Sequence, residues 1–187
     1  MLAPRIAQGA KAAGIIVLAG NTRPLQALVV EQLRYLASLD PAHAAEHAAA
    51  IREAEQAARE IESPALQPRT MVKLLGTTIP GSYFIDLRGY EPAQVAARLG
   101  LPVLVMRGER DYQVTQADFE GWKAAFHGSS RATFHLYFGL GHLFMPSTTP
   151  GNGLGSPADY EHADHVAGAV IDDIVSWVAA TGRAHSR

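Results

Sequence analysis

The sequence predicts an α/β protein with a parallel sheet, because three short runs have the pattern of buried strands. The run "GIIVLAG" (14–20) is wholly apolar and bounded by glycines, as in a strand buried on both faces. The run "LPVLVMRG" (101–108) has a similar aliphatic character. The run "ATFHLYFG" (132–139) is rich in β-branched and aromatic residues, which favour strands.

The segment between the second and third runs predicts a helix. Thr115 can cap its start, and Phe119, Trp122 and Phe126 recur at helical spacing on one face. A strand, a helix and a strand in this order form a βαβ unit, whose two strands run parallel. A loop rich in Gly, Pro, Ser and Thr follows the third strand, and a last helix is expected within 165–182.

Residues 21–100 interrupt this pattern with several helices. Pro24 marks a helix start, and Leu and Val residues then recur at helical spacing. Parallel strands are usually connected by one helix, so we expect an α-helical lid or cap inserted into a core made of 1–20 and 101–187. A helical hairpin used for assembly is the alternative.

Composition excludes several classes of function. The 187 residues carry a net charge of −2 and no long basic block, so neither nucleic acid nor a membrane surface is expected as a partner. Cysteine is absent, which excludes disulfides, thiolate metal sites and cysteine nucleophiles. No apolar run approaches the roughly 18 residues of a membrane span. We therefore expect a soluble globular protein.

Two polar residues follow the ends of the second and third predicted strands. Asp111 comes three residues after Gly108, and His142 lies between two apolar loop residues 31 positions further on. Parallel strands bring such groups to one edge of the sheet. An acid followed by a base in this order is typical of a Ser-Asp-His hydrolase triad, in which the carboxylate orients the imidazole. A turn or cap role for each residue is the structural alternative.

Several segments resemble the C-terminal half of bacterial α/β-hydrolase esterases of the EstD type. They are "GIIVLAGNTRPLQALVVEQLRYL", "RDYQVT" and "GLGHLF", and the resemblance covers nearly the whole chain. It implies the last three parallel strands of a partial α/β-hydrolase fold with a lid insertion. It also implies hydrolysis of a small-molecule carboxylic ester without metal or organic cofactor. Asp111 would be the triad acid and His142 the triad base.

The nucleophile of that family has no counterpart in this sequence. No G-x-S-x-G occurs, and Ser129, Ser130 and Ser156 lack the strand–turn–helix context that such a nucleophile needs. The resemblance begins just after the nucleophile motif, so we expect the isolated chain to be inactive. An export signal would lie upstream too, which leaves the compartment open, with the cytoplasm as the default.

A missing first half would also leave one strand without a neighbour. In the resembled fold the strand at 14–20 pairs on both sides, and here one partner is not encoded. An apolar strand with an open edge is a template for pairing with another chain. We therefore expect self-association, or pairing with a partner, through 14–20.

Aromatic residues supply candidates for a substrate pocket. Tyr83, Phe84, Tyr112 and Phe144 could line an acyl pocket between lid and sheet, as could Tyr90, or they could be core residues. The sequence does not separate these two roles.

Two alternatives to the esterase hypothesis come from other features. The helical insertion could make the chain a non-catalytic binding or self-assembly module. A metal-dependent hydrolase could use the cluster of His162, Asp164 and His165, which lie close together in the sequence. A zinc site needs three or four convergent ligands, so capping or surface roles are favoured for these residues. No metal is therefore expected. His43 and His47 lack the H-E-x-x-H arrangement and are interpreted as solvated residues of the insertion.

Overall fold

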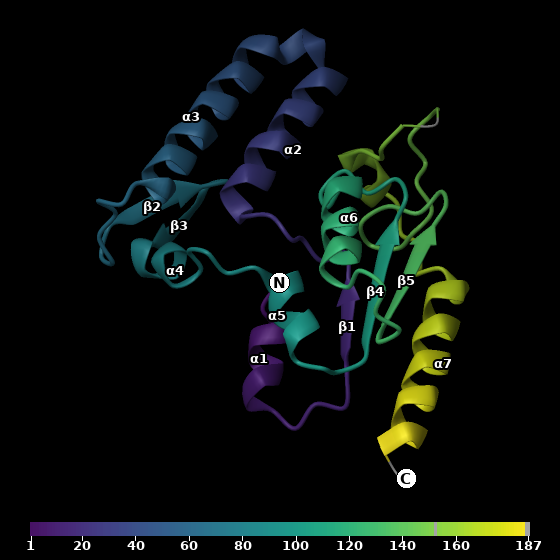
Figure 1. Cartoon of the computed structure of the whole chain (residues 1–187). Helices are drawn as coiled ribbons and strands as arrows, with labels where there is room; N and C mark the ends of the chain where they lie inside the picture. Colours follow the sequence, from purple (N-terminus) through teal and green to yellow (C-terminus); the bar gives the residue numbers. More distant parts are fainter. Residues whose placement is uncertain (152, 186–187) are drawn as a thin grey trace. The chain divides into compact units, whose positions relative to one another are not determined.

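The computed structural model describes residues 1–151 and 153–185. The chain divides into two compact units (Figure 1). Unit 1 consists of Met1–Thr22 and Glu91–Arg187, and unit 2 is Arg23–Tyr90. The sheet and the two polar residues at its edge all belong to unit 1.

Unit 1 contains a parallel three-stranded sheet. Its strands are β1 (Ile15–Leu18), β4 (Val103–Gly108) and β5 (Ala132–Tyr137), in the order β1-β4-β5. Both pairings are parallel, and Val105 of β4 lies opposite Val17 and Phe134. The predicted α/β class with three parallel strands is confirmed, and it is compatible with a partial α/β-hydrolase fold.

Strand β4 is the centre of this unit because every one of its residues is buried. Alternate side chains point to opposite faces of a strand. Val103 and Val105 therefore pack into one hydrophobic cluster, and Leu104 and Met106 pack into another. The unbroken apolar run in the sequence reflects this burial on both faces.

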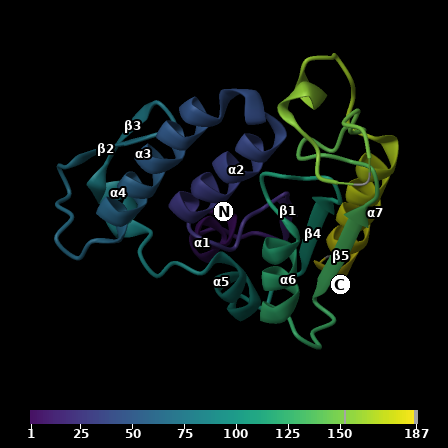
Figure 2. The same ribbon diagram turned by 90° about the horizontal axis from the view of Figure 1, so that it is seen from above.

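Helices cover both faces of the sheet (Figure 2). The cluster around Val103 contains side chains from α1 (Ala3–Gly9), α5 (Pro92–Arg98) and α6 (Gln116–Ala125). The cluster around Leu104 contains Val170, Ile174 and Trp177 of α7, on the opposite face. Helix α7 is Gly168–His185, and a short 3-10 helix, η2, spans Pro157–Tyr160. Helix α6 and its aromatic face agree with the expectation from the sequence.

Unit 2 combines a helical pair with a β-hairpin. Its elements are α2 (Leu25–Leu39), η1 (Pro41–His43), α3 (Ala44–Glu62), β2 (Met71–Leu74), β3 (Thr77–Pro80) and α4 (Gly81–Asp86). Helices α2 and α3 pack against each other, and Val29, Ile61 and Val72 form part of a separate core.

The hairpin was not expected from the sequence. Its two strands pair antiparallel around a turn at Leu75 and Gly76, both of which have positive φ. A two-residue turn of this kind matches the twist of the strands. Its usual sequence is Asn-Gly, and here Leu takes the place of Asn, so the sequence does not indicate the turn.

Residues 91–100 lie in unit 1, whereas the sequence placed them in the insertion. Helix α5 in this segment buries Ala93 and Ala96 against Ala7 of α1. Its small-residue face is short, which is why the sequence pattern did not distinguish it from the preceding helices. Among the described residues, no helix has the length and apolar character needed to cross a bilayer.

Val105 tests whether β4 is the core strand. Its side chain is 1% exposed, whereas Val178 of α7 is 51% exposed. We expect Val105→Ala to lower the free energy of unfolding by about 2 kcal/mol, because it removes two buried methyl groups and leaves a cavity. Val178→Ala, the matched control, should change it by less than about 0.5 kcal/mol. Chemical denaturation measures both, and equal effects would contradict the assignment of β4.

Candidate active site

Asp111 and His142 meet at the carboxyl edge of the sheet. Strand β4 ends at Gly108 and β5 ends at Tyr137, and each strand is followed by the loop that carries one of the two residues. His142 Nδ1 lies 2.9 Å from Asp111 Oδ2. The parallel strands thus bring together two side chains that are 31 positions apart in sequence.

The Asp111 carboxylate is fully buried, and each of its oxygens has a separate role. Oδ1 accepts hydrogen bonds from the backbone N–H groups of Gln113 and Val114, at 2.8 and 2.9 Å. Oδ2 faces His142, and the whole residue is 0% exposed. An ionised carboxylate only accepts hydrogen bonds, so the imidazole donates from Nδ1–H. The neutral ring then carries its lone pair on Nε2, as a general base requires.

Arg107 donates hydrogen bonds to the backbone of the loop that carries Asp111. This buried side chain of β4 donates from Nε to the Val114 carbonyl at 2.9 Å, and from Nη2 to the carbonyls of Glu109 and Asp111. Burial lowers the pKa of the Arg107 guanidinium from its usual value, and the nearby carboxylates of Asp111, Glu109 and Asp118 oppose that shift. The cation therefore fixes the backbone around Asp111 and leaves the carboxylate free for the imidazole.

Gly108 allows the His142 loop to cross the end of β4. A Cβ at this position would overlap the carbonyl oxygens of Leu140 and Gly141. Two backbone hydrogen bonds join the loops: Glu109 N–H to the Tyr137 carbonyl at 2.8 Å, and Arg110 N–H to the Leu140 carbonyl at 2.9 Å. The glycine is thus required by the close approach of the two loops rather than by a positive φ.

His142 lies at the tip of a tight loop. Gly141 N–H donates to the Met145 carbonyl and Ser147 N–H to the Gly139 carbonyl, both at 2.9 Å, so the loop is closed at its base. Phe144 is buried although its φ is +58°, a backbone conformation that bulky residues rarely adopt. Such backbone strain gathers at functional sites. The His142 side chain is 26% exposed, so the ring is accessible at this edge.

The four predicted pocket residues fall in different units. Phe144 packs in the cluster of Leu104, and Tyr112 is buried one position after Asp111. Tyr83 and Phe84 belong to unit 2, where their rings make an edge-to-face contact at 5.3 Å. Phe84 and Phe144 thus each fill the core of their own unit.

His43, His47 and His165 make local contacts. His43 Nδ1 and His47 Nε2 lie 2.8 and 3.2 Å from Asp40 Oδ2 at the turn between α2 and α3. Asp164 Oδ1 accepts from the backbone N–H of His165. In the part of the chain that the structure describes, no group of three or more acidic or histidine side chains could hold a metal ion.

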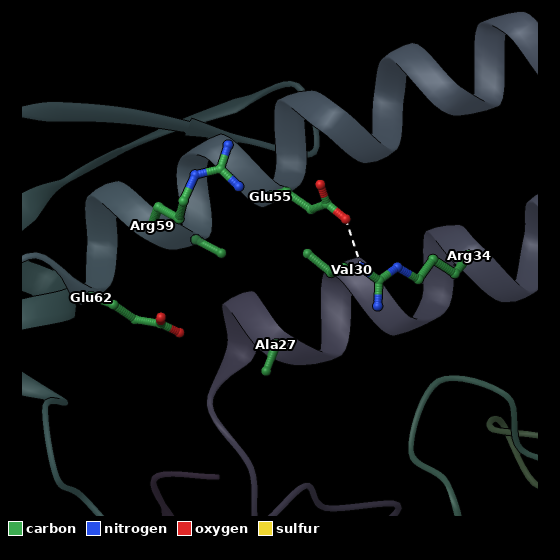
Figure 3. A pocket seen from close by; sticks show the side chains of 7 residues that line it. Ala27, Val30, Arg34, Glu55, Arg59 and Glu62 are labelled. Atoms are coloured by element: carbon green, nitrogen blue, oxygen red, sulfur yellow. Dashed lines mark hydrogen bonds and ion pairs between the residues drawn. The ribbon is translucent and has the colours of Figure 1, made fainter.

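Unit 2 has an open groove between its two long helices (Figure 3). Its volume is about 510 Å³, and Arg34 and Glu55 form an ion pair of 2.6 Å across it. The residues that line it come from α2 and α3 alone: Ala27, Val30, Arg34, Glu55, Ala58, Arg59 and Glu62. Asp111 and His142 contribute nothing to this groove.

Sequence reasoning missed the residues that support the pair. The sequence indicates Arg107 only as the end of a strand. Gly108 carried a usable signal, because a glycine at the end of a buried strand indicates a close approach of other backbone.

The similarity of this chain to a known protein agrees with the geometry of the site. No protein-family model matches the sequence. Over 178 residues, 95% of the chain, it is 36% identical to "Esterase EstD" of Thermotoga maritima. The sequence matches the C-terminal part of an EstD-type esterase. It spans 40% of the length of that protein, and the resemblance recognised in the sequence is confirmed.

Gly108 tests the crossing of the two loops. We expect Gly108→Ala to lower the free energy of unfolding by about 1–3 kcal/mol, because the new methyl group meets backbone carbonyls that cannot move independently. Gly168→Ala is the control, because a Cβ at Gly168 meets nothing within 4 Å. Thermal or chemical unfolding of both variants measures the difference. If Gly108→Ala has the stability of the parent chain, the loops do not cross as described.

Proposed function

We propose that this chain supplies the acid and the base of a Ser-His-Asp carboxylic ester hydrolase. The observation that carries the proposal is the hydrogen bond between buried Asp111 and accessible His142 at the carboxyl edge of a parallel sheet. The similarity to an esterase supports the same chemistry. The substrate is a small carboxylic ester, and the reaction uses no cofactor.

Each of the two residues has a defined part in the reaction. His142 Nε2 removes the proton from a serine hydroxyl as it attacks the ester carbonyl, and then donates that proton to the leaving alcohol. In this proposed reaction Asp111 keeps Nδ1 protonated and stabilises the imidazolium that forms between these steps. A water molecule then releases the acyl group by the same proton transfers.

The serine must come from outside these 187 residues, which contain no G-x-S-x-G. The oxyanion hole of such hydrolases also involves the backbone amide after the nucleophile. We therefore propose that the chain alone does not turn over esters, and that unit 2 acts as the lid of the complete enzyme.

A binding or self-assembly module is the second candidate function. The groove between α2 and α3 favours it, because alanine and valine side chains line this groove together with charged residues. In this alternative, unit 2 is the functional surface and the Asp111–His142 pair is structural.

A chimeric protein separates the two candidates. The chain is joined behind the part of the Thermotoga maritima esterase that precedes the matched region, and hydrolysis of a p-nitrophenyl ester is measured. We expect His142→Gln to lower kcat by at least about 10³-fold, because the general base is lost. His162→Gln, an exposed histidine, is the control and should leave kcat unchanged.

Unchanged turnover in the His142→Gln chimera would contradict the esterase proposal and favour the binding module. Labelling with a fluorophosphonate tests the chain alone, without any fusion. The proposal predicts no covalent adduct, and an adduct on any serine of this chain would show that it has its own nucleophile.

The edge of β1 is proposed to associate with another strand. Within the described residues β1 pairs only with β4, and Leu18 on β1 is 50% exposed. The outer edge of β1 has no strand neighbour among the described residues, and an apolar edge strand favours pairing with a second polypeptide. That strand is proposed to come from a second copy of this chain or from the segment that precedes the matched region in an EstD-type esterase.

We expect the apparent mass of the chain in size-exclusion chromatography with light scattering to rise with concentration. Leu18→Lys should shift it towards the monomer, because a charged residue on an edge strand opposes pairing. Leu39→Lys is the control, since Leu39 is 45% exposed but lies in unit 2. A compact monomer of the unmodified chain at tens of micromolar would contradict the proposal.

A further inference from the structure

The loop that follows His142 is organised around a single carboxylate. We define the Asp159 loop as residues 147–151 and 153–160. Its composition, rich in Gly, Pro, Ser and Thr, is typical of irregular connections. Asp159 inside it is only 8% exposed, and its hydrogen-bond donors in the described loop are hydroxyl and backbone N–H groups.

Both oxygens of Asp159 act as acceptors. Oδ1 accepts from the backbone N–H and the hydroxyl of both Thr148 and Thr149, at 2.8–3.1 Å. Oδ2 accepts from the Ser147 hydroxyl at 2.8 Å and from the Ser156 N–H at 3.1 Å. Burial alone would raise the pKa of Asp159, but these hydrogen bonds outweigh it and hold the pKa at about 2. These hydrogen bonds therefore favour the ionised form of the Asp159 carboxyl group.

One of these contacts fixes the base of the His142 loop. The Ser147 N–H closes that loop by donating to the Gly139 carbonyl at 2.9 Å, and the Ser147 hydroxyl donates to Asp159. Ser147 is thus held between the carboxylate and the strand end. The position of His142, five residues before Ser147, depends on this anchor.

Further contacts connect the same loop to the neighbour of Asp111. The Arg110 guanidinium donates to the Thr149 carbonyl at 2.7 Å and to the Gly153 carbonyl at 2.9 Å. The Arg110 carbonyl accepts from the Gly155 N–H at 2.6 Å. A Cβ on Gly155 would overlap Asp159 Oδ2, so the carboxylate and this backbone are in close contact.

We propose that Asp159 is a positioning residue for the catalytic pair, because its carboxylate anchors one loop that holds both the base of the His142 loop and Arg110 beside Asp111. It acts through Ser147 and Thr149 and reaches neither Asp111 nor His142 directly. This inference rests on the proposed esterase function, since it assigns a role to a residue of that site.

Nuclear magnetic resonance of the ¹⁵N-labelled full chain tests the proposal without needing turnover. Long-range ¹H–¹⁵N spectra report which imidazole nitrogen carries the proton in each neutral histidine. We expect Asp159→Asn to reduce the preference of His142 for the Nδ1–H form by about tenfold, because misplacing the ring weakens a charge-assisted hydrogen bond. The exposed Asp164→Asn is the matched control and should leave His142 unchanged.

His135 is an internal reference in the same spectra. Its Nδ1 lies 2.7 Å from Asp173 Oδ2, in a contact between β5 and α7 that does not involve the Asp159 loop. The proposal predicts that this histidine keeps its spectrum in Asp159→Asn. Equal changes in His135 and His142 would show a general loss of structure and would overturn the specific positioning role.

Ser147→Ala gives a second, milder test if Asp159→Asn does not fold. It removes only the hydroxyl that connects Asp159 to the His142 loop, and it keeps the backbone N–H. We expect a smaller shift of His142 in the same direction. An unchanged His142 in a folded Asp159→Asn or Ser147→Ala chain would overturn the proposal.

Failure of this inference is distinguishable from failure of the proposed function. If the chimera hydrolyses esters but its Asp159→Asn form has the same kcat and KM as the parent, Asp159 does not position the pair, while the esterase proposal stands. If Asp159→Asn alters His142 in the spectra but the parent chimera is inactive, the structural coupling stands and the esterase function is contradicted.

Discussion

The candidate site depends on one hydrogen bond, from His142 Nδ1–H to the buried carboxylate of Asp111. A buried carboxylate without hydrogen-bond donors would be costly, so the protein must supply donors to both oxygens. Two backbone N–H groups satisfy Oδ1, and the imidazole satisfies Oδ2. The consequence for chemistry is that this hydrogen bond selects the tautomer with the lone pair on Nε2, on a side chain that is partly exposed.

The parallel arrangement of β4 and β5 is what makes this bond possible. Both strands end at the same edge, and Gly108 lets the loop before His142 cross over the end of β4. Arg107 donates hydrogen bonds to backbone carbonyls of the Asp111 loop. Arg110 of the same loop donates to the Thr149 carbonyl in the Asp159 loop. Asp111 and His142 thus lie on loops, but backbone hydrogen bonds connect these loops to each other and to the strand ends. This combination of irregular backbone and rigid support is common at enzyme sites.

The sequence predicted the features that depend on local pattern. The three strands, α6 and the Asp111–His142 pair followed from apolar runs, helical spacing and the position of polar residues after strands. The β-hairpin of unit 2 and the place of α5 did not follow, because Leu75 conceals the turn and the alanine face of α5 is short. The roles of Arg107 and Asp159 also could not be predicted, since their partners are brought together only by the folded loops. The match covers 40% of the length of the esterase. The nucleophile is therefore proposed to lie in a segment outside the matched region.

The central claim is that Asp111 accepts the Nδ1 proton of His142, and a proton spectrum tests it most directly. A proton in a charge-assisted imidazole–carboxylate hydrogen bond resonates at unusually low field. The structure predicts such a resonance for His142 in the full chain, and its loss in Asp111→Asn, where the amide is a weaker acceptor. A low-field resonance that persists in Asp111→Asn, or an intact chain in which His142 carries its proton on Nε2, would contradict the claim.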